Sequence, residues 1–438
     1  MKRNVFEQII EWDNQKESRP ILLTGAPCTG KTYLALELAK NFHNSYLYLN
    51  PEQDCRLRIA LTELSRQEKP DFEAFLSDYF KIPSEWLQDF LVIIDDYDYH
   101  NALISLIETL VSQRNTFRLL LISTISPSEK LQKQCTITKI APLEFDEYLK
   151  AIGSEWYTDI IRGHYQTQKK IPDIVHKEML NLFRDFLRIG GMPSAVNEYL
   201  QTDSLNNLSA IHKNIYHTYL AEFTRRYDES KSLRLQQLYS GIAEQLLKPN
   251  KNFRYNMIRK GATHNMYKQE LQLLEDLHLI NKIERAELNH NGFNNTYDIN
   301  AQENQFRLYP NDSGLLYTMI LSTIPYEFSE NTEEESGTEF SDVLYQLLAE
   351  TYFAQLLDTR TLQKLFWEST SLSKIDFLTL YDNCLVPFEL KFSNSKRSKS
   401  MNIFCNKYSI EQYKRFSTQN FETSQAFISS PIYASFCL

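Results

Sequence analysis

Short uninterrupted apolar runs alternate with amphipathic stretches over the first 140 residues. The runs PILLT, SYLYLN, FLVIIDD and RLLLIST each hold only a few polar residues. Such runs predict strands buried on both faces of a parallel sheet, and the amphipathic stretches between them predict covering helices. We therefore expect an α/β domain over residues 1–140.

The pattern changes after residue 140. Helical periodicity fills residues 141–230, in EFDEYLKAIG, KEMLNLFRDFLRIGG and NIYHTYLAEFTRRY. Three helical stretches and a hairpin, the order of a winged helix, occupy residues 231–320. An acidic stretch from Glu327 to Asp342 then predicts a linker to a last domain, residues 321–438, with one long helix and two strand-like runs. The fold class is thus multidomain α/β.

Composition limits the partners and the compartment. The formal net charge is -9, so nucleic acid can be held only by local basic patches. The six cysteines are scattered without a C-x-x-C pair, which favours a reducing cytoplasm. No run approaches 18 uncharged apolar residues, so we expect neither a membrane span nor a signal peptide. A homo-oligomer is compatible with these numbers.

The segment GAPCTGKT matches the phosphate-binding pattern G-x-x-x-x-G-K-[ST] and lies between PILLT and a helical stretch. Its glycines let successive backbone N–H groups face phosphate oxygens at the start of a helix. We expect Lys31 to reach the β- and γ-phosphates and Thr32 to offer its hydroxyl to Mg²⁺. The predicted nucleotide-binding residues are Gly25, Ala26, Pro27, Cys28, Thr29, Gly30, Lys31 and Thr32. The expected cofactors are ATP and Mg²⁺.

The run FLVIIDD supplies the acidic half of such a site. Asp95 ends an apolar strand and is predicted to join the magnesium shell. Asp96 holds the place of a water-activating base, but its side chain is one methylene shorter than Glu, which predicts slow hydrolysis. Ser123, which ends RLLLIS, is a candidate γ-phosphate sensor.

Two strands near the C-terminus, KIDFLTLY and CLVPFELKF, flank a two-residue turn. Counting outward from that turn sets Asp376 opposite Glu389 on one sheet face. Facing carboxylates repel each other unless a cation lies between them, so the register predicts a second Mg²⁺ or Mn²⁺.

Lys391 lies two residues after Glu389, on the same face, because side chains alternate along a strand. A metal-dependent nuclease needs this set of groups: two carboxylates hold the metal, and a lysine stabilises charge. Glu350, on the preceding helix, would complete the metal shell. The alternative is an exposed hairpin with ordinary surface charges.

Nearly the whole chain resembles a family: prokaryotic AAA-type ATPases with a C-terminal domain of unknown function that has a PD-(D/E)xK nuclease-like fold. The resemblance is carried by the motifs GAPCTGKT, VIIDD, IAPLEFDEYL, FLRIGGMP, FRYNMIRKGA, LQLLEDLHLI, FRLYPNDSGLL, AETYFAQLL, KIDF and VPFELK, in that order. It implies an AAA+ P-loop core over residues 1–140, a helical lid over 141–230, a winged helix over 231–320 and a nuclease-like domain over 321–438.

The same resemblance implies that Gly191 and Pro193, in the Gly-Gly-x-Pro element, close on the nucleotide base. The chain departs from the family at three sites. Asp96 stands where Glu is usual, Pro27 and Cys28 stand where the P-loop often has basic or bulky residues, and Lys374 stands where an acid often precedes Ile-Asp-Phe. No arginine finger is assigned. Fold resemblance alone does not establish cleavage.

Two basic segments are candidate nucleic-acid contacts, with DNA favoured over RNA. The first lies on the predicted winged helix and includes Arg254, Arg259 and Lys260, while the second, with Lys396, Arg397 and Lys399, follows Lys391. A recognition helix near 263–277 would contain acids that suit base reading poorly, so the alternative for the first segment is a winged helix that binds protein. The alternative for the second segment is an ordinary solvated face.

Three functions are compatible with this sequence. The first is an ATP-dependent switch coupled to a metal-dependent DNA nuclease domain. The second is an ATP-regulated binding or signalling protein whose nuclease-like domain is inactive. The third is a motor that remodels protein partners as a ring, with an arginine supplied in trans.

Overall fold

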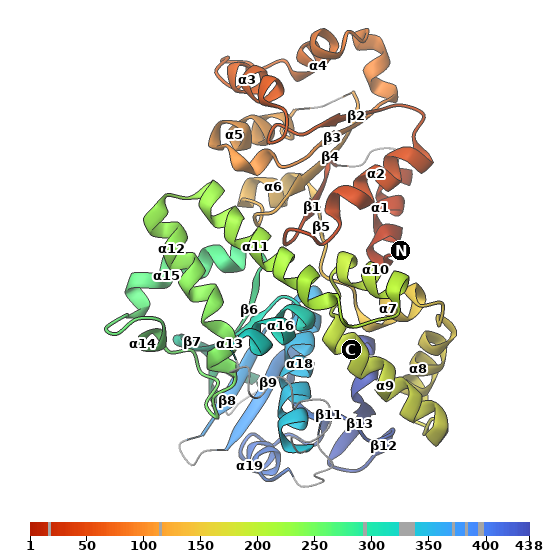
Figure 1. Cartoon of the computed structure of the whole chain (residues 1–438), viewed down its shortest axis with the longest axis vertical. Coiled ribbons are helices and arrows are strands. Elements are labelled where there is room, and N and C mark those ends of the chain that lie inside the picture. Colours follow the sequence, from red (N-terminus) through yellow and green to blue (C-terminus); the bar gives the residue numbers. More distant parts are fainter. Residues whose placement is uncertain are drawn as a thin grey trace. The chain divides into compact units, whose positions relative to one another are not determined.

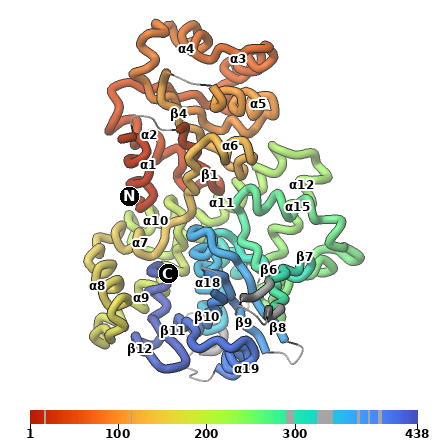
Figure 2. The backbone as a smooth tube through the Cα atoms, turned by 180° about the vertical axis from the view of Figure 1, so that it is seen from behind, coloured from red at the N-terminus to blue at the C-terminus, as the bar shows by residue number. Residues whose placement is uncertain are grey.

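A computed structural model of the chain describes residues 1–15, 19–113, 116–291, 296–323, 338–369, 373–381, 384–392 and 398–438. Its elements group into two compact units (Figures 1 and 2). We call residues 2–141 together with 276–278 the N-terminal unit, and residue 1 with 142–275 and 279–438 the C-terminal unit. Among these residues, no helix is long and apolar enough to span a membrane.

A parallel five-stranded sheet forms the centre of the N-terminal unit, in the order β2-β3-β4-β1-β5. Its strands are β1 (Ile21–Thr24), β2 (Tyr46–Leu49), β3 (Leu91–Ile94), β4 (Arg118–Ser123) and β5 (Thr136–Lys139). The four apolar runs are confirmed as strands. The fifth strand was not predicted because it is an edge strand with the polar sequence TITK, whose first two residues are exposed.

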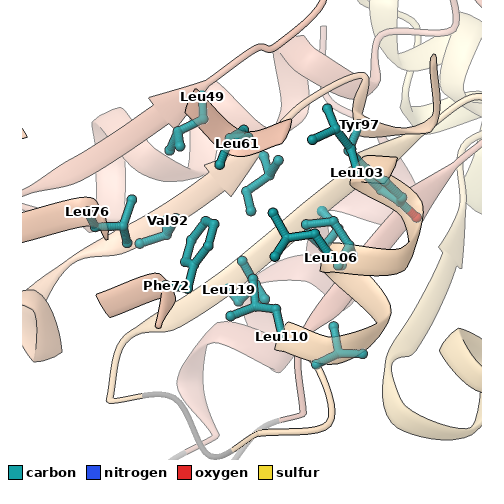
Figure 3. Packing of buried hydrophobic residues seen from close by; sticks show 14 of the residues in the cluster. Leu49, Leu61, Phe72, Leu76, Val92, Tyr97, Leu103, Leu106, Leu110 and Leu119 are labelled. Atoms are coloured by element: carbon teal, nitrogen blue, oxygen red, sulfur yellow. The ribbon is translucent and has the colours of Figure 1, made fainter. Parts of the chain in front are cut away.

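Helices cover both faces of this sheet. They are α1 (Asn4–Asn14), α2 (Lys31–Phe42), α3 (Cys55–Leu64), α4 (Phe72–Phe80), α5 (Asn101–Leu110) and α6 (Glu129–Gln134). Short 3-10 turns occupy Ser84–Asp89 and Tyr97–Tyr99. Leucines of α3, α4 and α5 pack with Val92 and Leu119 on one face, as Figure 3 shows, and apolar residues of α1 and α2 fill the other face. Both faces of the central strands are thereby buried, which is why these strands lack alternating polar positions.

The C-terminal unit begins with a helical region. Its helices are α7 (Phe145–Ala151), α8 (Trp156–Thr167), α9 (Asp173–Ile189), α10 (Pro193–Thr202), α11 (Leu208–Arg226), α12 (Glu229–Ser240), α13 (Ile242–Leu246), α14 (Tyr255–Ile258), α15 (His264–Asp276, whose last residue belongs to the other unit) and α16 (Ser313–Thr323). The three helical stretches and the hairpin expected after residue 230 occur in the predicted order.

A mixed eight-stranded sheet completes this unit, in the order β12-β13-β11-β10-β9-β8-β6-β7. Its strands are β6 (Ile280–Asn291), β7 (Thr296–Pro310), β8 (Leu365–Glu368), β9 (Lys374–Tyr381), β10 (Cys384–Lys391), β11 (Tyr413–Ser417), β12 (Glu422–Thr423) and β13 (Phe427–Pro431). The β6–β7 hairpin joins the later strands because β6 pairs in parallel with β8. The hairpin predicted for a winged helix and the last predicted domain therefore share one sheet.

Two helices pack on opposite faces of that sheet. On one face, Phe353 of α18 (Thr338–Thr359) contacts Phe377 of β9 and Phe388 of β10. On the other, Met401 and Phe404 of α19 (Lys399–Lys407) join a cluster with Ile375, Leu378 and Leu385. In Figures 1 and 2, α18 lies alongside β9 and β10. The chain ends in a 3-10 turn at Ile432–Cys437.

Two predicted features lie wholly or partly outside the described residues. The acidic linker Glu327–Asp342 falls there as far as residue 337, and from Thr338 its sequence belongs to α18. The turn at 382–383 also lies outside, but the pairing of Tyr381 with Cys384 on either side of it is as predicted.

Candidate functional site: a phosphate-binding loop and a closed acidic sheet

The loop between β1 and α2 has the shape that triphosphate binding requires. Gly25 has φ +151°, and a Cβ there would lie 2.2 Å from the backbone oxygen of Ile140, so only glycine fits. Cys28 adopts the left-handed region at φ +66°, unusual for a residue with a Cβ. The loop closes at Lys31, the first residue of α2, so the first N–H groups of that helix face the loop.

Lys31 is buried inside this loop. Its Nζ donates hydrogen bonds to the carbonyl oxygens of Gly25 and Ala26, both at 2.8 Å. Burial lowers the pKa of Lys31, although the nearby carboxylates of Asp96, Asp98 and Asp95 oppose that shift. A buried ammonium that bonds only to neutral carbonyls is poised to exchange them for phosphate oxygens, which are better partners.

Asp95 lies next to Thr32 at the carboxyl end of β3. Its Oδ2 accepts hydrogen bonds from the Thr32 hydroxyl at 2.7 Å and from the Tyr48 hydroxyl at 2.8 Å. Its Oδ1 is buried without a hydrogen-bond partner. Burial raises the pKa of Asp95, which those hydrogen bonds oppose. A buried acceptor beside a hydroxyl is the donor set that Mg²⁺ needs once ATP supplies the remaining oxygens, so these residues fit the ion.

Asp96 occupies a strained position one residue later. It adopts a left-handed φ of +52°, and its Oδ2 accepts from the Asn50 side-chain amide at 3.2 Å. Burial and the neighbouring Asp95 and Asp98 raise the pKa of Asp96 to about 6. Its carboxylate is thus a better proton acceptor than an exposed one, which suits the predicted water-activating role.

Ser123 ends β4 as predicted, on the strand edge that also carries Thr24 and the acids. Its hydroxyl bonds to the backbone oxygen of Ile125 at 2.9 Å. The Asp98 carboxylate accepts from the backbone N–H groups of Thr124 and Ile125 and so holds this loop. The sensor role of Ser123 stays a prediction.

Sequence reasoning missed four residues of this site. Tyr48 and Asn50 lie at the carboxyl end of β2, Asp98 follows the acid pair, and Arg3 donates to the backbone oxygens of Thr29 and Ala141. Polar residues at the carboxyl end of SYLYLN were a usable signal, because ligands of open parallel sheets bind there. For Arg3 there was no such signal, because the residues that it contacts are distant in sequence.

The Gly-Gly-x-Pro element belongs to the C-terminal unit. A Cβ on Gly191 would lie 2.2 Å from the backbone oxygen of Leu143, and the Gly191 N–H donates to Asp312 at 2.6 Å. Pro193 is the first residue of α10. These contacts explain the residue types through packing, and the predicted role of Gly191 and Pro193 at the nucleotide base remains a prediction.

In the C-terminal unit, Asp376 is held by an arginine. Its carboxylate accepts from Arg307 at 2.7 Å, and the Arg307 side chain is only 2% exposed. Burial alone would raise the pKa of Asp376, but Arg307, Lys251 and Lys374 outweigh it and hold that pKa below its usual value.

Glu350 lies on the same side of the sheet as Asp376. It is 1% exposed, accepts from Lys251 at 2.7 Å through both oxygens, and accepts from the Tyr309 hydroxyl at 2.9 Å. Its lone pairs are therefore already used. Lys251, which lies three residues before Arg254 of the first basic segment, is turned toward this acid.

Glu389 has a separate set of partners. Its carboxylate contacts Arg415 at 2.8 Å, the Ser398 hydroxyl at 2.6 Å and Lys391 at 3.3 Å. The prediction that Glu389 and Lys391 share one sheet face is confirmed. Arg415 is the direct partner of Glu389 on β11 and packs over the Phe427 ring.

The prediction that Asp376 and Glu389 face each other is wrong, because β9 carries a bulge. The pairing of β8 with β9 jumps from Leu365–Leu378 to Trp367–Ile375, so β9 has one extra residue there. Asp376 and Phe377 consequently point to the α18 face, whereas Glu389 follows Phe388 and points to the α19 face. One extra residue reverses the side of every residue beyond it.

The predicted second metal site does not fit these residues. Its carboxylates lie on opposite faces and each is bonded to a cation. Across the described ranges, no three His, Cys, Asp or Glu side chains gather closely enough to hold a metal ion. Glu350 and Asp376 share a neighbouring cation, since Lys251 bonds to Glu350 and lowers the pKa of Asp376.

The predicted nucleic-acid contacts differ in whether the structure describes them. Arg254, Arg259 and Lys260 are exposed around α14, and Lys399 is exposed at the start of α19. Lys396 and Arg397 lie outside the described residues. The predicted recognition helix is α15, and its Glu270 is 3% exposed and bonded to Arg234 at 2.6 Å. One of the three acids that argued against nucleic acid therefore does not face solvent, whereas the other two, Glu275 and Asp276, are half-buried.

Two protein-family models match different parts of the chain. Residues 17–149 match the model of the AAA domain, and residues 180–325 match that of a domain of unknown function, DUF8612. The matched domain of unknown function thus covers part of the helical region and the β6–β7 hairpin, whereas the family resemblance had put such a domain at the C-terminus. No curated protein matches the chain.

Two solved structures are similar to the chain. The Walker-type ATPase of Pyrococcus abyssi shares 14% identity and covers 73% of this chain and 95% of its own, with a TM-score of 0.44. The RuvB Holliday junction branch migration motor of Thermotoga maritima shares 13% identity and covers 64% and 89%, with a TM-score of 0.32.

Proposed function

We propose, from the premise that residues 17–149 are an AAA-family ATP-binding domain, that this chain is an ATP-hydrolysing switch that binds DNA without cutting it. The P-loop residues and Asp95 bind and orient ATP with Mg²⁺, which neutralises charge on the phosphates when bound. Asp96 takes a proton from the attacking water. Because its side chain is short, turnover is slow, as suits a switch.

The exposed face of α15 is the observation that carries the DNA-binding part. Its exposed residues are Asn265, Met266, Lys268, Gln269 and Gln272. None is acidic. Asparagine and glutamine side chains pair with adenine edges in the major groove, and lysine with guanine. Lys268 meets Glu303 of β7 in an exposed pair, which is too weak to mask the helix.

Arg254, Arg259 and Lys260 lie just before α15 in the sequence and are exposed. Cations beside a reading helix are placed to contact phosphates, which fix the protein on the duplex. A winged helix over residues 231–320 and a homo-oligomeric assembly are parts of the same proposal.

Binding is tested by fluorescence anisotropy of a labelled DNA duplex across a salt series. Arg259→Ala should weaken binding to all sequences and lower the salt slope by about 1. Gln269→Ala should cost about 1 to 3 kcal/mol on the preferred sequence and little on others. Lys40→Ala, at an exposed position of α2, is the matched charge control. Equal binding by Arg259→Ala and the control would refute the proposal.

Metal-dependent cleavage is the second candidate function. It is favoured by the intact Glu389–Lys391 pair, which is 3.3 Å apart, and by the topology of β8, β9 and β10 between α18 and α19. Cleavage would require a metal to displace Arg307 from Asp376 and Arg415 from Glu389. A nuclease-like domain whose acids are neutralised by arginines instead suits recognition or assembly.

Incubation of the protein with single- and double-stranded DNA, Mg²⁺ or Mn²⁺, and with or without ATP separates these two functions. We expect no cleavage by the unmodified chain. Cleavage that disappears in Asp376→Ala would establish the nuclease and overturn the non-cutting part. ATP turnover in the same samples, abolished by Lys31→Ala, reports the AAA site independently.

A further inference from the structure

Three residues at the junction of α15 and β6, residues 276–278, belong to the N-terminal unit. The helix ends at Asp276, and the segment 276–278 groups with residues 2–141, whereas Leu279 and the strand after it do not. The same short segment therefore continues α15 and contacts the sheet that carries the phosphate-binding loop.

His278 makes the central contact of this segment. Its Nε2 lies 3.0 Å from the Thr24 hydroxyl and 3.5 Å from the Ser126 hydroxyl. The Thr24 hydroxyl has one proton and also lies 3.2 Å from the backbone oxygen of Ile125, so when it donates to that oxygen, Nε2 of His278 donates to Thr24. The backbone of the segment adds a second tie, because Ser126 N–H donates to the Asp276 oxygen at 2.8 Å.

His278 lies just after α15 in a left-handed backbone conformation. Its φ is +56°, and the Leu279 N–H donates to the backbone oxygen of Leu274 at 3.0 Å, which is a common way for a helix to close its C-terminal end. The end of the helix therefore fixes the backbone of His278.

Both partners of His278 flank the nucleotide site. Thr24 directly precedes Gly25 of the phosphate-binding loop, and Ser126 lies three residues after Ser123 on the loop that follows β4. His278 contacts the Thr24 hydroxyl while the backbone oxygen of Asp276, in the same segment, accepts from the Ser126 N–H, so the segment fixes the spacing of these two loops. Phosphate transfer depends on such spacing, since small displacements of positioned groups cost large factors in rate.

We propose that His278 is a positioning residue for ATP hydrolysis through which α15 controls the nucleotide site. His278 holds the phosphate-binding loop and the loop after β4 at the separation that catalysis requires. Because the segment is continuous with α15, a ligand that shifts the end of α15 alters ATP turnover, and by reciprocity ATP alters affinity for that ligand. The positioning role is independent of DNA binding, and the control by DNA rests on the proposed function.

Two substitutions of His278 distinguish the effect of its side-chain hydrogen bond to Thr24 from the effect of its left-handed backbone conformation. His278→Asn tolerates the left-handed φ but is too short to reach Thr24, whereas His278→Gln can place an amide near the Nε2 position. His278→Asn should lower kcat for ATP about 3- to 10-fold with KM changed less than about 3-fold, the loss of one hydrogen bond. His278→Gln should recover most of that loss. His217→Asn, at an exposed site on α11, is the control and should match the unmodified chain.

Thr24→Val removes the same bond from the other side, together with the Thr24 bond to the Ile125 oxygen, and provides a double-mutant cycle. The double variant Thr24→Val, His278→Asn should lose no more activity than Thr24→Val alone, because the bond that His278→Asn removes is then already absent. Losses that multiply, or an unchanged kcat in His278→Asn, would overturn the positioning role. Thermal unfolding curves identify any variant that fails to fold, in which case the other partner's substitution decides.

The control by α15 has its own readout. A DNA duplex should change kcat of the unmodified chain, and His278→Asn should bind the duplex with unchanged Kd but lose that change in kcat. A response that persists in His278→Asn would overturn the transmission. If no duplex binds even the unmodified chain, the DNA-binding function fails, while the basal kcat of the variants still tests the positioning role.

Discussion

Two acidic regions of this molecule look alike in sequence and differ in structure. At the end of β3, Asp95 keeps one oxygen without a partner, and its nearest cation, Lys31, bonds instead to backbone carbonyls. In the eight-stranded sheet, Asp376 and Glu389 each bond directly to an arginine. The first region keeps its charges available for a ligand, and the second satisfies them internally. Acid residues alone thus do not make a metal site, since what matters is whether the fold has already paired them.

The largest expected effect is on the rate of ATP hydrolysis, and it distinguishes a catalytic role of the first region from a role in nucleotide binding alone. Asp96→Asn should lower kcat for ATP by about 100- to 10,000-fold with nucleotide affinity retained, because the water loses its proton acceptor. Steady-state kinetics with a fluorescent-nucleotide binding assay measures both quantities. If kcat falls less than tenfold, Asp96 is not the base.

The pH profile sharpens this prediction. The base must be ionised, and a pKa raised to about 6 means that it is largely protonated below pH 6. The ratio kcat/KM should therefore fall about tenfold per pH unit below 6, where an ordinary aspartate would stay active to about pH 4. Asp98→Asn keeps the oxygen acceptor but removes a like charge, so it should move the fall to lower pH.

The second prediction tests whether arginine really closes the other region. Arg307→Ala leaves Asp376 and Glu368 with fewer cations and should destabilise the C-terminal unit by about 2 to 4 kcal/mol. The value is below that of a fully buried pair, because Asp376 is 36% exposed. Urea unfolding followed by tryptophan fluorescence measures it, since Trp367 lies in the same sheet.

The double variant Arg307→Ala, Asp376→Asn should regain part of that stability, because it removes the uncompensated charge. The exposed Arg259→Ala serves as the control and should lie within about 0.5 kcal/mol of the unmodified chain. Millimolar Mn²⁺ that restores Arg307→Ala but not the double variant would reveal a latent metal site. An Arg307→Ala variant as stable as the control would break the contrast between the two regions.

The smallest effect concerns how firmly Asp95 is oriented. Tyr48→Phe removes one of its two hydroxyl donors and leaves Thr32. The Mg²⁺ concentration for half-maximal ATP turnover should rise about 2- to 10-fold, as the loss of one hydrogen bond predicts. Tyr46→Phe in the same strand is the matched control. An identical Mg²⁺ dependence for both variants would mean that Thr32 alone orients the carboxylate.

The N-terminal unit shows how much local sequence can determine. Its four apolar strands and its phosphate-binding loop follow from contiguous signals: buried runs, a glycine pattern and a helix that starts at Lys31. Asp95 and Asp96 were identified because they directly end a predicted strand. The edge strand β5 was missed because its pairing with β1, rather than its composition, makes it a strand.

The sequence by itself determined the AAA site, the order of the helices and the pairing of β9 with β10 from Tyr381–Cys384 to Phe377–Phe388. Only the tertiary structure decided the rest. A single bulge sent Asp376 and Glu389 to opposite faces, and Arg307 and Arg415 reached those acids from strands distant in sequence. Glu270 turned inward to Arg234, and His278 came to Thr24 across more than 250 residues. Periodicity describes residues along one chain segment, whereas charge pairing depends on which segments meet, and that is settled by packing.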